Sequence, residues 1–378
     1  MQELAENFRF MLVGLMPKGT DYEKILQEME ELKSLVKTYG GEVFAATVQK
    51  ADYPNRATFI GSGKAQEIAE IIAKEKIDII VINDIVKPGQ LYTLEKIFFR
   101  SNPKIKVWDR VNLILQIFSL HAQTKEAKLQ IDLANLRHMG PRIYGMGYIL
   151  SRQGGGIGAV GEGETNTELM KRHFRDEMRH ILNQLAKLSD ERKRQIEKRK
   201  SMGFLTCAIV GYTNAGKTLL FNRLTNKDNL VADALFVTLD SSVGKLHQTS
   251  DKQQVIVSDT IGFIKNLPPS LIDAFKSTLL ESMNADLLLI VIDVSDPEFA
   301  EKIRVVDEIL HELHLEGKNQ LYVFNKTDIA LPAQAGKSLD RADLLKRHMD
   351  FHPLFISAKT GEGIDILQNT ILESIAQI

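Results

Sequence analysis

The sequence is nearly free of cysteine and of net charge, and it contains no long apolar run. Its single cysteine, Cys207, cannot form an internal disulfide, so we expect a buried core thiol. Because 48 basic side chains balance 49 acidic ones, any contact with nucleic acid must come from a local patch. The most apolar run, Leu287 to Ile292, is too short to span a membrane, so we expect no integral membrane insertion.

The N-terminus also lacks the features of a secretory signal. Residues 1–6 carry acids where such a signal would carry bases, and we therefore expect a cytoplasmic protein. With 378 residues, of which 44% are hydrophobic and 26% charged, the chain has the composition of a globular protein with two or three domains. We expect three: an N-terminal α/β domain at 1–110, a helical pair with a glycine-rich loop at 111–201, and a second α/β domain at 202–378.

The first region alternates short apolar runs with segments of helical spacing. This order predicts a mostly parallel sheet flanked by helices. The tetrapeptide Gly61 to Lys64 looks superficially like a phosphate loop but lacks the second half of either nucleotide pattern, so a helix N-cap is the preferred interpretation. The expected strands are 8–14, 43–48, 58–60, 78–82 and 105–108, and the expected helices are 20–37, 65–74 and 90–98.

Two long helices are predicted in the middle region. One runs from Lys125 to Met139, and the other begins near Thr167 with apolar residues recurring on one face. A glycine-rich segment, Gly154 to Glu164, joins them, which predicts an antiparallel pair with a mobile tip. A plain linker remains an equally open interpretation of that segment.

The second of these helices carries an excess of basic side chains. Arg172, Arg175 and Arg179 recur on one side of the helix, where they can follow a phosphate backbone. A solvated charged face is the alternative interpretation. In a protein of almost zero net charge, this local concentration favours a contact with nucleic acid.

Residues 211–218 have the composition and context of a phosphate-binding loop. They lie between an apolar run, Phe204 to Val210, and a helical segment, Leu219 to Leu224. Glycines let backbone N–H groups turn toward phosphate oxygens, while Lys217 places charge on the β and γ phosphates and the Thr218 hydroxyl reaches Mg²⁺. By itself such a loop could be an ordinary glycine turn. The predicted loop residues are Gly211, Tyr212, Thr213, Asn214, Ala215, Gly216, Lys217 and Thr218.

Two segments downstream have the positions of nucleotide-sensing switches. Thr238 follows the helical segment Leu219 to Leu224. A mobile segment at this place can bring the threonine hydroxyl to Mg²⁺ only while the γ phosphate is present. Asp259 directly follows a strand and can hold the Mg²⁺ shell through water, and the Gly262 N–H can reach the γ phosphate. The predicted catalytic residues are therefore Lys217, Thr238, Asp259 and Gly262, with Thr218 and Thr238 as metal ligands.

Two further motifs, each at the end of an expected strand, select the base. The Asp328 carboxylate can accept from the N1–H and the exocyclic amine of guanine, whereas adenine presents no such pair of donors. The Ala358 N–H would reach guanine O6, and the Lys326 stem can cover the ring. The predicted base-binding residues are Asn325, Lys326, Asp328, Ser357, Ala358 and Lys359. These motifs indicate GTP as substrate and predict a Ras-like P-loop GTPase domain after the N-terminal α/β domain and the helical pair.

The chain resembles the HflX GTPases of the translation-factor-related class over nearly its whole length. The resemblance is carried by Trp108-Asp109-Arg110, Pro141-Arg142, the loop Ser151 to Gly158, the phosphate loop and the segment Asp259 to Ile264. It implies GTP hydrolysis, binding to the large ribosomal subunit and its rRNA, and, in related proteins, splitting of stalled or idle ribosomes under stress. We expect a monomer. A GTPase for ribosome assembly or tRNA modification, and an RNA-binding module with GTP as a structural ligand, remain alternatives.

Some positions depart from related GTPases. Phe263 stands where Ras-type enzymes place the water-orienting glutamine, so slow intrinsic hydrolysis is expected. Asn214 matches an asparagine that some relatives use to bind K⁺, although it could merely stabilise the loop. The family usually continues Pro-Thr-Thr-Arg where this chain has Ser241 to Gly244, which affects the first switch. The chain ends soon after the last expected helix, 363–375, which implies that the extra C-terminal domain of some relatives is missing.

Overall fold

A computed structural model describes residues 8–153, 162–232, 234–236, 242–247, 254–265, 268, 271, 275, 279–330 and 354–377. The chain divides into two compact units. One comprises the residues up to 120 together with 128–184, and the other comprises 121–127 together with the residues from 185 onward. The α/β class expected from the sequence is confirmed in both, while the three-domain division remains a prediction.

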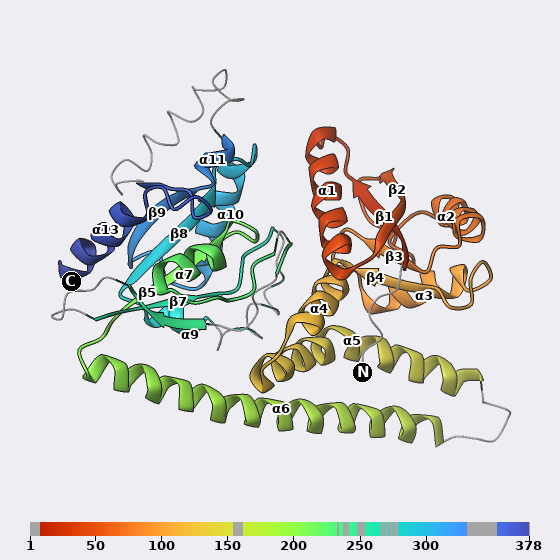
Figure 1. Cartoon of the computed structure of the whole chain (residues 1–378). Coiled ribbons are helices and arrows are strands. Elements are labelled where there is room, and N and C mark those ends of the chain that lie inside the picture. The colour runs from red at the N-terminus through yellow and green to blue at the C-terminus, as the bar shows by residue number, and fades with distance from the viewer. Residues whose placement is uncertain are drawn as a thin grey trace. The chain divides into compact units, whose positions relative to one another are not determined.

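The first unit is built on a four-stranded parallel sheet in the order β2-β1-β3-β4. Its helices α2 and α3 pack with alternate residues of β1 and β3 in one core, and α1 lies on the other face (Figure 1). The connection from β1 to β2 and the connection from β3 to β4 run in opposite directions along the sheet. Because both crossovers are right-handed, their helices α1 and α3 lie on opposite faces. The elements are β1 (Arg9–Met16), α1 (Tyr22–Tyr39), β2 (Glu42–Lys50), α2 (Ser62–Glu75), β3 (Ile79–Ile82), α3 (Pro88–Phe98) and β4 (Lys106–Asp109).

Helix α1 illustrates how the local sequence sets these elements. The Asp21 carboxylate accepts a hydrogen bond of 3.0 Å from the Glu23 N–H and caps the first turn. The helix ends at Gly40, whose φ of 93° lies in the left-handed region that glycine adopts without strain. Its buried residues recur at helical spacing and are Ile25, Met29, Leu32, Leu35 and Val36.

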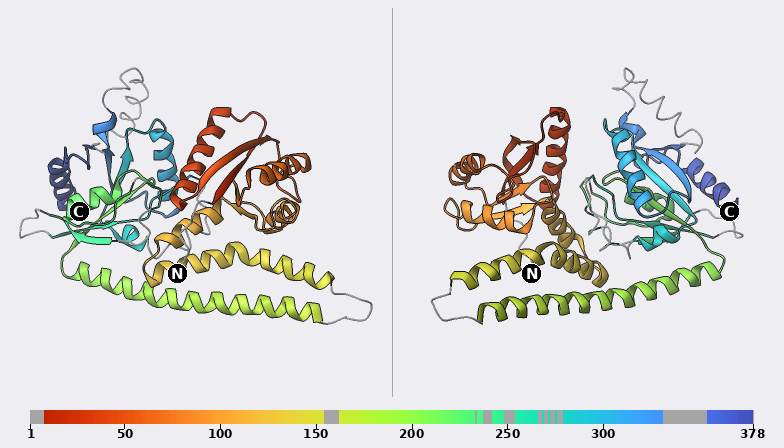
Figure 2. Two further views of the ribbon diagram at one scale, coloured as in Figure 1. Left: turned by 45° about the vertical axis from the view of Figure 1, so that its right-hand side comes forward. Right: turned by 180° about the vertical axis from the view of Figure 1, so that it is seen from behind.

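Three helices follow the first sheet: α4 (Arg110–His121), α5 (Lys125–Gln153) and α6 (Glu162–Ser201). Helix α5 extends beyond the predicted end at Met139, and α6 begins at Glu162, earlier than the predicted start near Thr167. In the first unit α5 and α6 run antiparallel, side by side (Figure 2). The predicted antiparallel pair is confirmed, while most of the glycine-rich segment lies outside the described residues.

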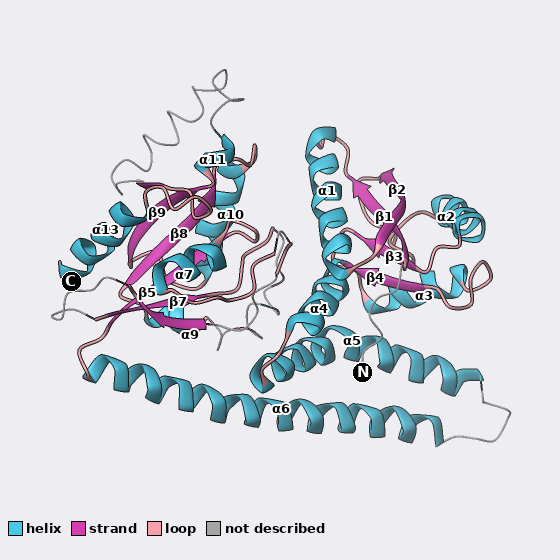
Figure 3. Cartoon of the chain, viewed as in Figure 1, coloured by secondary structure: helices cyan, strands magenta, loops and turns pink. Residues whose placement is uncertain are grey.

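The second unit contains a six-stranded sheet in the order β10-β9-β8-β5-β7-β6, with β6 antiparallel to its neighbour. Figure 3 labels four of these strands, β5, β7, β8 and β9. Strands β5 and β8 are buried on both faces, which explains why they are continuous apolar runs. Cys207 on β5 has no exposed surface, so the prediction of a core thiol is confirmed. The strands are β5 (Leu205–Gly211), β6 (Ser242–Lys245), β7 (Val255–Asp259), β8 (Leu287–Asp293), β9 (Asn319–Asn325) and β10 (Leu354–Phe355).

The described helices of this unit flank the sheet and connect its strands. Helix α7 follows the phosphate loop, α9 precedes β8, and α13 packs in the same core as α7. Their bounds are α7 (Lys217–Thr225), α9 (Leu280–Asn284), α10 (Phe299–Glu312), α11 (Thr327–Ala330) and α13 (Ile364–Ala376). Within the described part of the chain, no helix combines the length and apolarity needed to cross a bilayer.

Two expected strands are corrected by the structure. Residues 58–60 form a turn, because the Asn55 side chain accepts hydrogen bonds from the N–H groups of Ala57 and Thr58 and closes the loop locally. The sequence pattern also predicts a strand over 245–250, of which 248–250 lie outside the described residues; the structure places the strand at Ser242–Lys245, where its backbone pairs with β7. Most of the segment 241–244, where the sequence departs from the family, is therefore edge strand.

Candidate nucleotide-binding site

The carboxyl ends of the parallel strands in the second unit surround a cavity of about 390 Å³. The phosphate loop comes from the end of β5, Asp259 from the end of β7, and Asn325 from the end of β9. This edge of an open α/β sheet is where ligands bind in such folds. The predicted residues that line the cavity are Thr213, Asn214, Gly216, Lys217, Thr218, Gly262, Asn325, Lys326, Asp328 and Lys359.

Among the other predicted residues, Gly211, Tyr212 and Ala215 of the phosphate loop are buried and do not line the cavity. Asp259, Ser357 and Ala358 are buried and contact residues of the lining, as described below. Thr238 lies outside the described residues. The sequence reasoning missed an apolar contribution to the cavity from the segment after α7, although Leu230 and Val231 stand next to each other in the sequence. The full set of lining residues that the sequence did not predict is Leu219, Leu230, Val231, Ala232, Ala234, Phe236, Thr260 and Ile329.

Two glycines of the phosphate loop are required by close approach. A Cβ at Gly216 would lie 2.4 Å from the Asn325 amide nitrogen, and one at Gly211 would lie 2.3 Å from the Val291 carbonyl oxygen. Both residues also have positive φ, 89° at Gly216 and 148° at Gly211. The loop backbone therefore sits against β8 and β9 at a distance that side chains would prevent.

The floor of the loop brings together a lysine, a hydroxyl and a carboxylate. The Lys217 Nζ donates to the Tyr212 carbonyl oxygen at 2.7 Å, and the Thr218 Oγ1 donates to the Asp259 Oδ2 at 2.8 Å. A hydroxyl beside a carboxylate supplies the hard oxygen atoms that Mg²⁺ prefers, so these two residues fit that ion. A Cβ at Gly262 would lie only 2.9 Å from the Lys217 Nζ, so a side chain here would crowd the lysine. Glycine leaves the backbone of this position accessible to a ligand.

Burial shifts the pKa of both ionisable side chains at this floor, Asp259 and Lys217. Loss of solvent raises the pKa of Asp259 to about 6, although the Lys217 charge and the hydrogen bond from Thr218 act in the opposite direction. Burial likewise lowers the pKa of Lys217 to about 8, against the favourable charge of Asp259. Bound phosphate and Mg²⁺ would restore the charged forms, because each presents the opposite charge.

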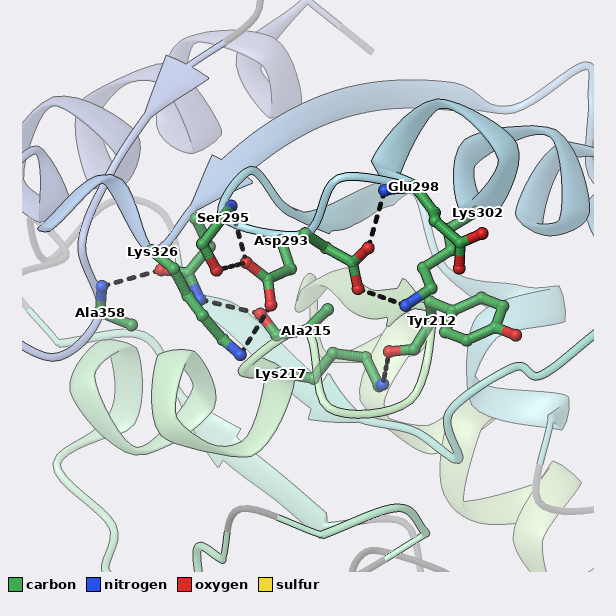
Figure 4. Close-up of polar contacts among 11 residues, drawn as sticks. Tyr212, Ala215, Lys217, Asp293, Ser295, Glu298, Lys302, Lys326 and Ala358 are labelled. Atoms are coloured by element: carbon green, nitrogen blue, oxygen red, sulfur yellow. Dashed lines mark hydrogen bonds and ion pairs between the residues drawn. The ribbon is translucent and has the colours of Figure 1, made fainter. Parts of the chain in front are cut away.

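The base side of the cavity is held by side chains that connect three loops (Figure 4). Asn325 donates through Nδ2 to the Ala215 carbonyl oxygen and accepts through Oδ1 from the Ala358 N–H, both at 2.9 Å. The Ser357 hydroxyl donates to the Asp328 Oδ1 at 2.7 Å, which orients that carboxylate. The Ala358 N–H, expected to reach guanine O6, thus already has an acceptor in Asn325.

Asp293 is a residue of this site that the sequence reasoning missed. Its Oδ2 lies 2.7 Å from the Lys326 Nζ, and its Oδ1 accepts hydrogen bonds from the N–H and hydroxyl of Ser295 (Figure 4). Lys326 has a φ of 66°, so its backbone turns sharply at the end of β9. The charge pair fixes the direction of the lysine stem, and the only indication in the sequence was an acid at the end of an apolar strand.

Phe263 is anchored beside the phosphate loop rather than directed at it. Its side chain is 1% exposed, and its backbone exchanges hydrogen bonds with Gly211 and Thr213. The chain after Gly262 is therefore tied to the loop by main-chain bonds. A buried phenyl ring offers no group that can hydrogen-bond to a water molecule, as the sequence had indicated.

Three family models match successive parts of the chain. The model for the GTP-binding GTPase N-terminal region matches residues 26–119, and that for the GTP-binding GTPase middle region matches 121–199. A third model, described as 50S ribosome-binding GTPase, matches 206–326. The last match covers the phosphate loop, Asp259 and Asn325.

Individual proteins match over greater lengths. The GTPase HflX of Caldanaerobacter subterraneus subsp. tengcongensis is 40% identical over 98% of this chain and 82% of its own length. The GTPase HflX of Escherichia coli is 35% identical over 94% of this chain and 80% of its own length. A crystal structure of SsGBP in complex with GDP is 26% identical, covers 98% of this chain and 99% of its own, and has a TM-score of 0.54. The chain therefore belongs to the HflX family of GTPases, whose P-loop domain hydrolyses GTP.

Proposed function

We propose that this chain hydrolyses GTP in the cavity of the second unit to regulate its binding to the large ribosomal subunit. The observation that carries the first half is the grouping of Lys217, Thr218 and Asp259 in the same site as Asn325 and Asp328. Phosphate-binding groups and base-binding groups then line one cavity. That is the arrangement that a nucleoside triphosphate requires.

The positions of the described residues support the following roles, and the role of Thr238 rests on its place in the sequence. Lys217 binds the β and γ phosphates, and the Gly262 N–H binds the γ phosphate. Thr218 and Thr238 would hold Mg²⁺ directly, Asp259 would hold it through water, and the ion would neutralise charge developing on the phosphate oxygens. Water is the nucleophile, and the chain contributes position and charge stabilisation.

Guanine is selected mainly by the Asp328 carboxylate. Asp328 accepts from the two donors on one edge of the base, and its orientation by Ser357 prepares it for both. The stem of Lys326, directed by Asp293, covers the ring. Adenine would leave the Asp328 carboxylate without donors, which would weaken adenine binding relative to guanine.

The ribosomal partner is inferred from the basic face of α6 and from the family. Arg172, Arg175 and Arg179 are exposed, while Ile181 and Leu185 on the same helix are buried. This separation presents positive charge to a phosphate backbone without disturbing the packing of the helix. We propose that the chain binds large-subunit rRNA through this face in the cytoplasm as a monomer, and that it splits or recycles stalled or idle ribosomes.

Turnover with purified ribosomal subunits tests this function. GTP hydrolysis is measured with the protein alone, with large subunits and with small subunits at equal RNA concentration. We expect large subunits to accelerate hydrolysis by about tenfold or more, which corresponds to about 1.4 kcal/mol of additional transition-state stabilisation. Equal rates in all three reactions would exclude a large-subunit-activated GTPase and favour a role in tRNA modification. Stronger activation by the small subunit would point to that subunit as the partner.

A further inference from the structure

Arg223 projects from the helix of the phosphate loop onto the loop that reads the base. It lies on α7, six residues after Lys217, and its side chain reaches the segment after β10. Its Nε donates to the Ala358 carbonyl oxygen at 3.1 Å, and its Nη2 donates to the Lys359 carbonyl oxygen at 2.8 Å. A planar guanidinium that spans two successive carbonyls restricts both peptide planes.

The same loop is held on its other side by residues of the base site. The Ala358 N–H donates to Asn325, and the Ser357 hydroxyl donates to Asp328. Ser357 is fully buried, and its carbonyl also accepts from the Gly361 N–H at 2.8 Å, so this end of the loop has its own supports. The carbonyls of residues 358 and 359 are the part of the loop that Arg223 holds.

A peptide plane couples those carbonyls to N–H groups. The C=O of Ala358 and the N–H of Lys359 belong to one planar unit and point in opposite directions. When Arg223 holds that carbonyl toward α7, the N–H of Lys359 must point away from it, and Lys359 lines the nucleotide cavity. Asn325 already occupies the Ala358 N–H, so the orientation of the neighbouring peptide decides which donor a base can meet.

We propose that Arg223 is a positioning residue that sets the backbone N–H of Lys359 for the 6-oxo group of guanine. The inference rests on the proposed base site. Arg223 is exposed and is not itself a lining residue of the cavity; it contacts the lining only through the Lys359 carbonyl, so it acts on the nucleotide through the loop. It also ties the helix that begins at Lys217 to the loop that reads the base.

Equilibrium binding of GDP and 6-thio-GDP to the parent protein and to Arg223→Ala tests the proposal. The two nucleotides share the donors that face Asp328 and differ at position 6, where sulfur accepts hydrogen bonds only weakly. The parent should prefer GDP. In Arg223→Ala the affinity for GDP should fall about three- to tenfold, while that for 6-thio-GDP changes less than twofold. The ratio of the two affinities, which is the preference for GDP, should therefore become smaller. IDP, which keeps the 6-oxo group, should lose as much affinity as GDP.

Two further variants separate positioning from a general structural effect. Arg223→Lys keeps the charge but cannot span two carbonyls, so it should narrow the preference as well. Arg304→Ala removes another exposed arginine, from α10, and should leave both affinities unchanged. Thermal unfolding of each variant verifies that it is folded.

The outcomes distinguish this inference from the proposed function. Equal losses for GDP and 6-thio-GDP in Arg223→Ala and Arg223→Lys, or no loss for either nucleotide, would overturn the positioning role while leaving the guanine site in place. A parent protein that binds ADP as tightly as GDP would overturn the guanine site itself, and the inference with it.

Discussion

Two ionisable side chains at the floor of the phosphate loop, Lys217 and Asp259, are buried. The pKa of Asp259 is raised to about 6 and that of Lys217 is lowered to about 8, mainly by burial. For an acid with a raised pKa, stability is highest below the unfolded-state value, about 3.9, and is lost as pH rises through the folded-state value. Near neutral pH, ionised Asp259 therefore destabilises the unliganded protein.

Asp259→Asn should consequently stabilise the nucleotide-free protein. Around pH 7 we expect a gain in the free energy of unfolding of about 1 to 3 kcal/mol, because one pKa unit corresponds to about 1.4 kcal/mol. The gain should shrink as the pH is lowered toward about 4, where the parent carboxyl is protonated. Urea unfolding in the presence of a chelator, between acidic and neutral pH, measures it. The exposed Glu316→Gln serves as the control, and a variant less stable than the parent at every pH would refute the assignment.

Asp328→Asn should change the base that the protein prefers. The substitution replaces an acceptor by a donor, which suits xanthine and leaves guanine with an unpaired group in the site. We expect GDP affinity to fall by about 10²-fold or more and XDP affinity to rise. Competition binding with both nucleotides decides the point, and unchanged GDP affinity would show that another residue reads the base.

Contiguous motifs allowed most of the nucleotide site to be predicted from the sequence. The residues 211–218 and Asp328 depend on local order and strand ends, which a sequence displays. The ion pair of Asp293 with Lys326 and the hold of Arg223 on residues 358 and 359 join segments far apart in the chain, and no local pattern encodes them. The same limit explains why the sequence did not show that the Ala358 N–H donates to Asn325 at the end of β9.

At the scale of elements, a nearly buried ion pair joins the end of α6 to α9. The Arg199 Nη2 lies 2.7 Å from the Glu281 Oε1, and the two side chains are 18% and 8% exposed. Helix spacing indicated that α6 has an apolar side but not that its last turns dock through this charge pair. Helix starts were similarly approximate, because the sequence around Glu162 carries no strong capping pattern.

Removing the arginine of this pair should destabilise the second unit. Arg199→Ala leaves the Glu281 carboxylate buried without its partner, and we expect a loss of roughly 3 kcal/mol, at the low end for a buried pair because of the remaining exposure. Arg304→Ala breaks an exposed pair with Glu301 and should cost at most about 1 kcal/mol. Denaturant unfolding compares the two, and equal small losses would mean that the Arg199 pair does not hold α6 to α9.

The phosphate loop is the element on which cation dependence should appear. Asn214 has a φ of 62° and lines the cavity, and Phe263 offers no group to orient water. We expect hydrolysis to be about tenfold faster in KCl than in NaCl, since a cation beside the phosphates can stabilise about 1.4 kcal/mol of developing charge. Asn214→Ala should abolish the difference without abolishing GDP binding. Equal turnover of the parent in both salts, with and without ribosomes, would leave Asn214 as a residue that merely stabilises the loop.

For the whole molecule, we propose that the nucleotide state governs engagement of the basic face of α6 with large-subunit rRNA. The sequence revealed the spacing of its arginines, and the structure adds that all three are exposed and that Arg179 pairs with Asp176. That pair is exposed and weak, so it can yield to a phosphate group. Contacts of this kind are sensitive to salt in proportion to the number of phosphates neutralised.

Co-sedimentation with purified large subunits measures this engagement. The parent is compared with the triple variant Arg172→Glu, Arg175→Glu and Arg179→Glu, each with a non-hydrolysable GTP analogue and with GDP. A variant with the same charge change on α1, Lys24→Glu, Lys33→Glu and Lys37→Glu, is the matched control. The parent and the control should bind more tightly with the analogue. The arginine variant should keep its GTP affinity but bind subunits at least about tenfold more weakly, with a salt slope reduced by about 2 to 3. If it sediments with large subunits as tightly as the parent at low and moderate salt, the account of α6 as the RNA-binding face is wrong.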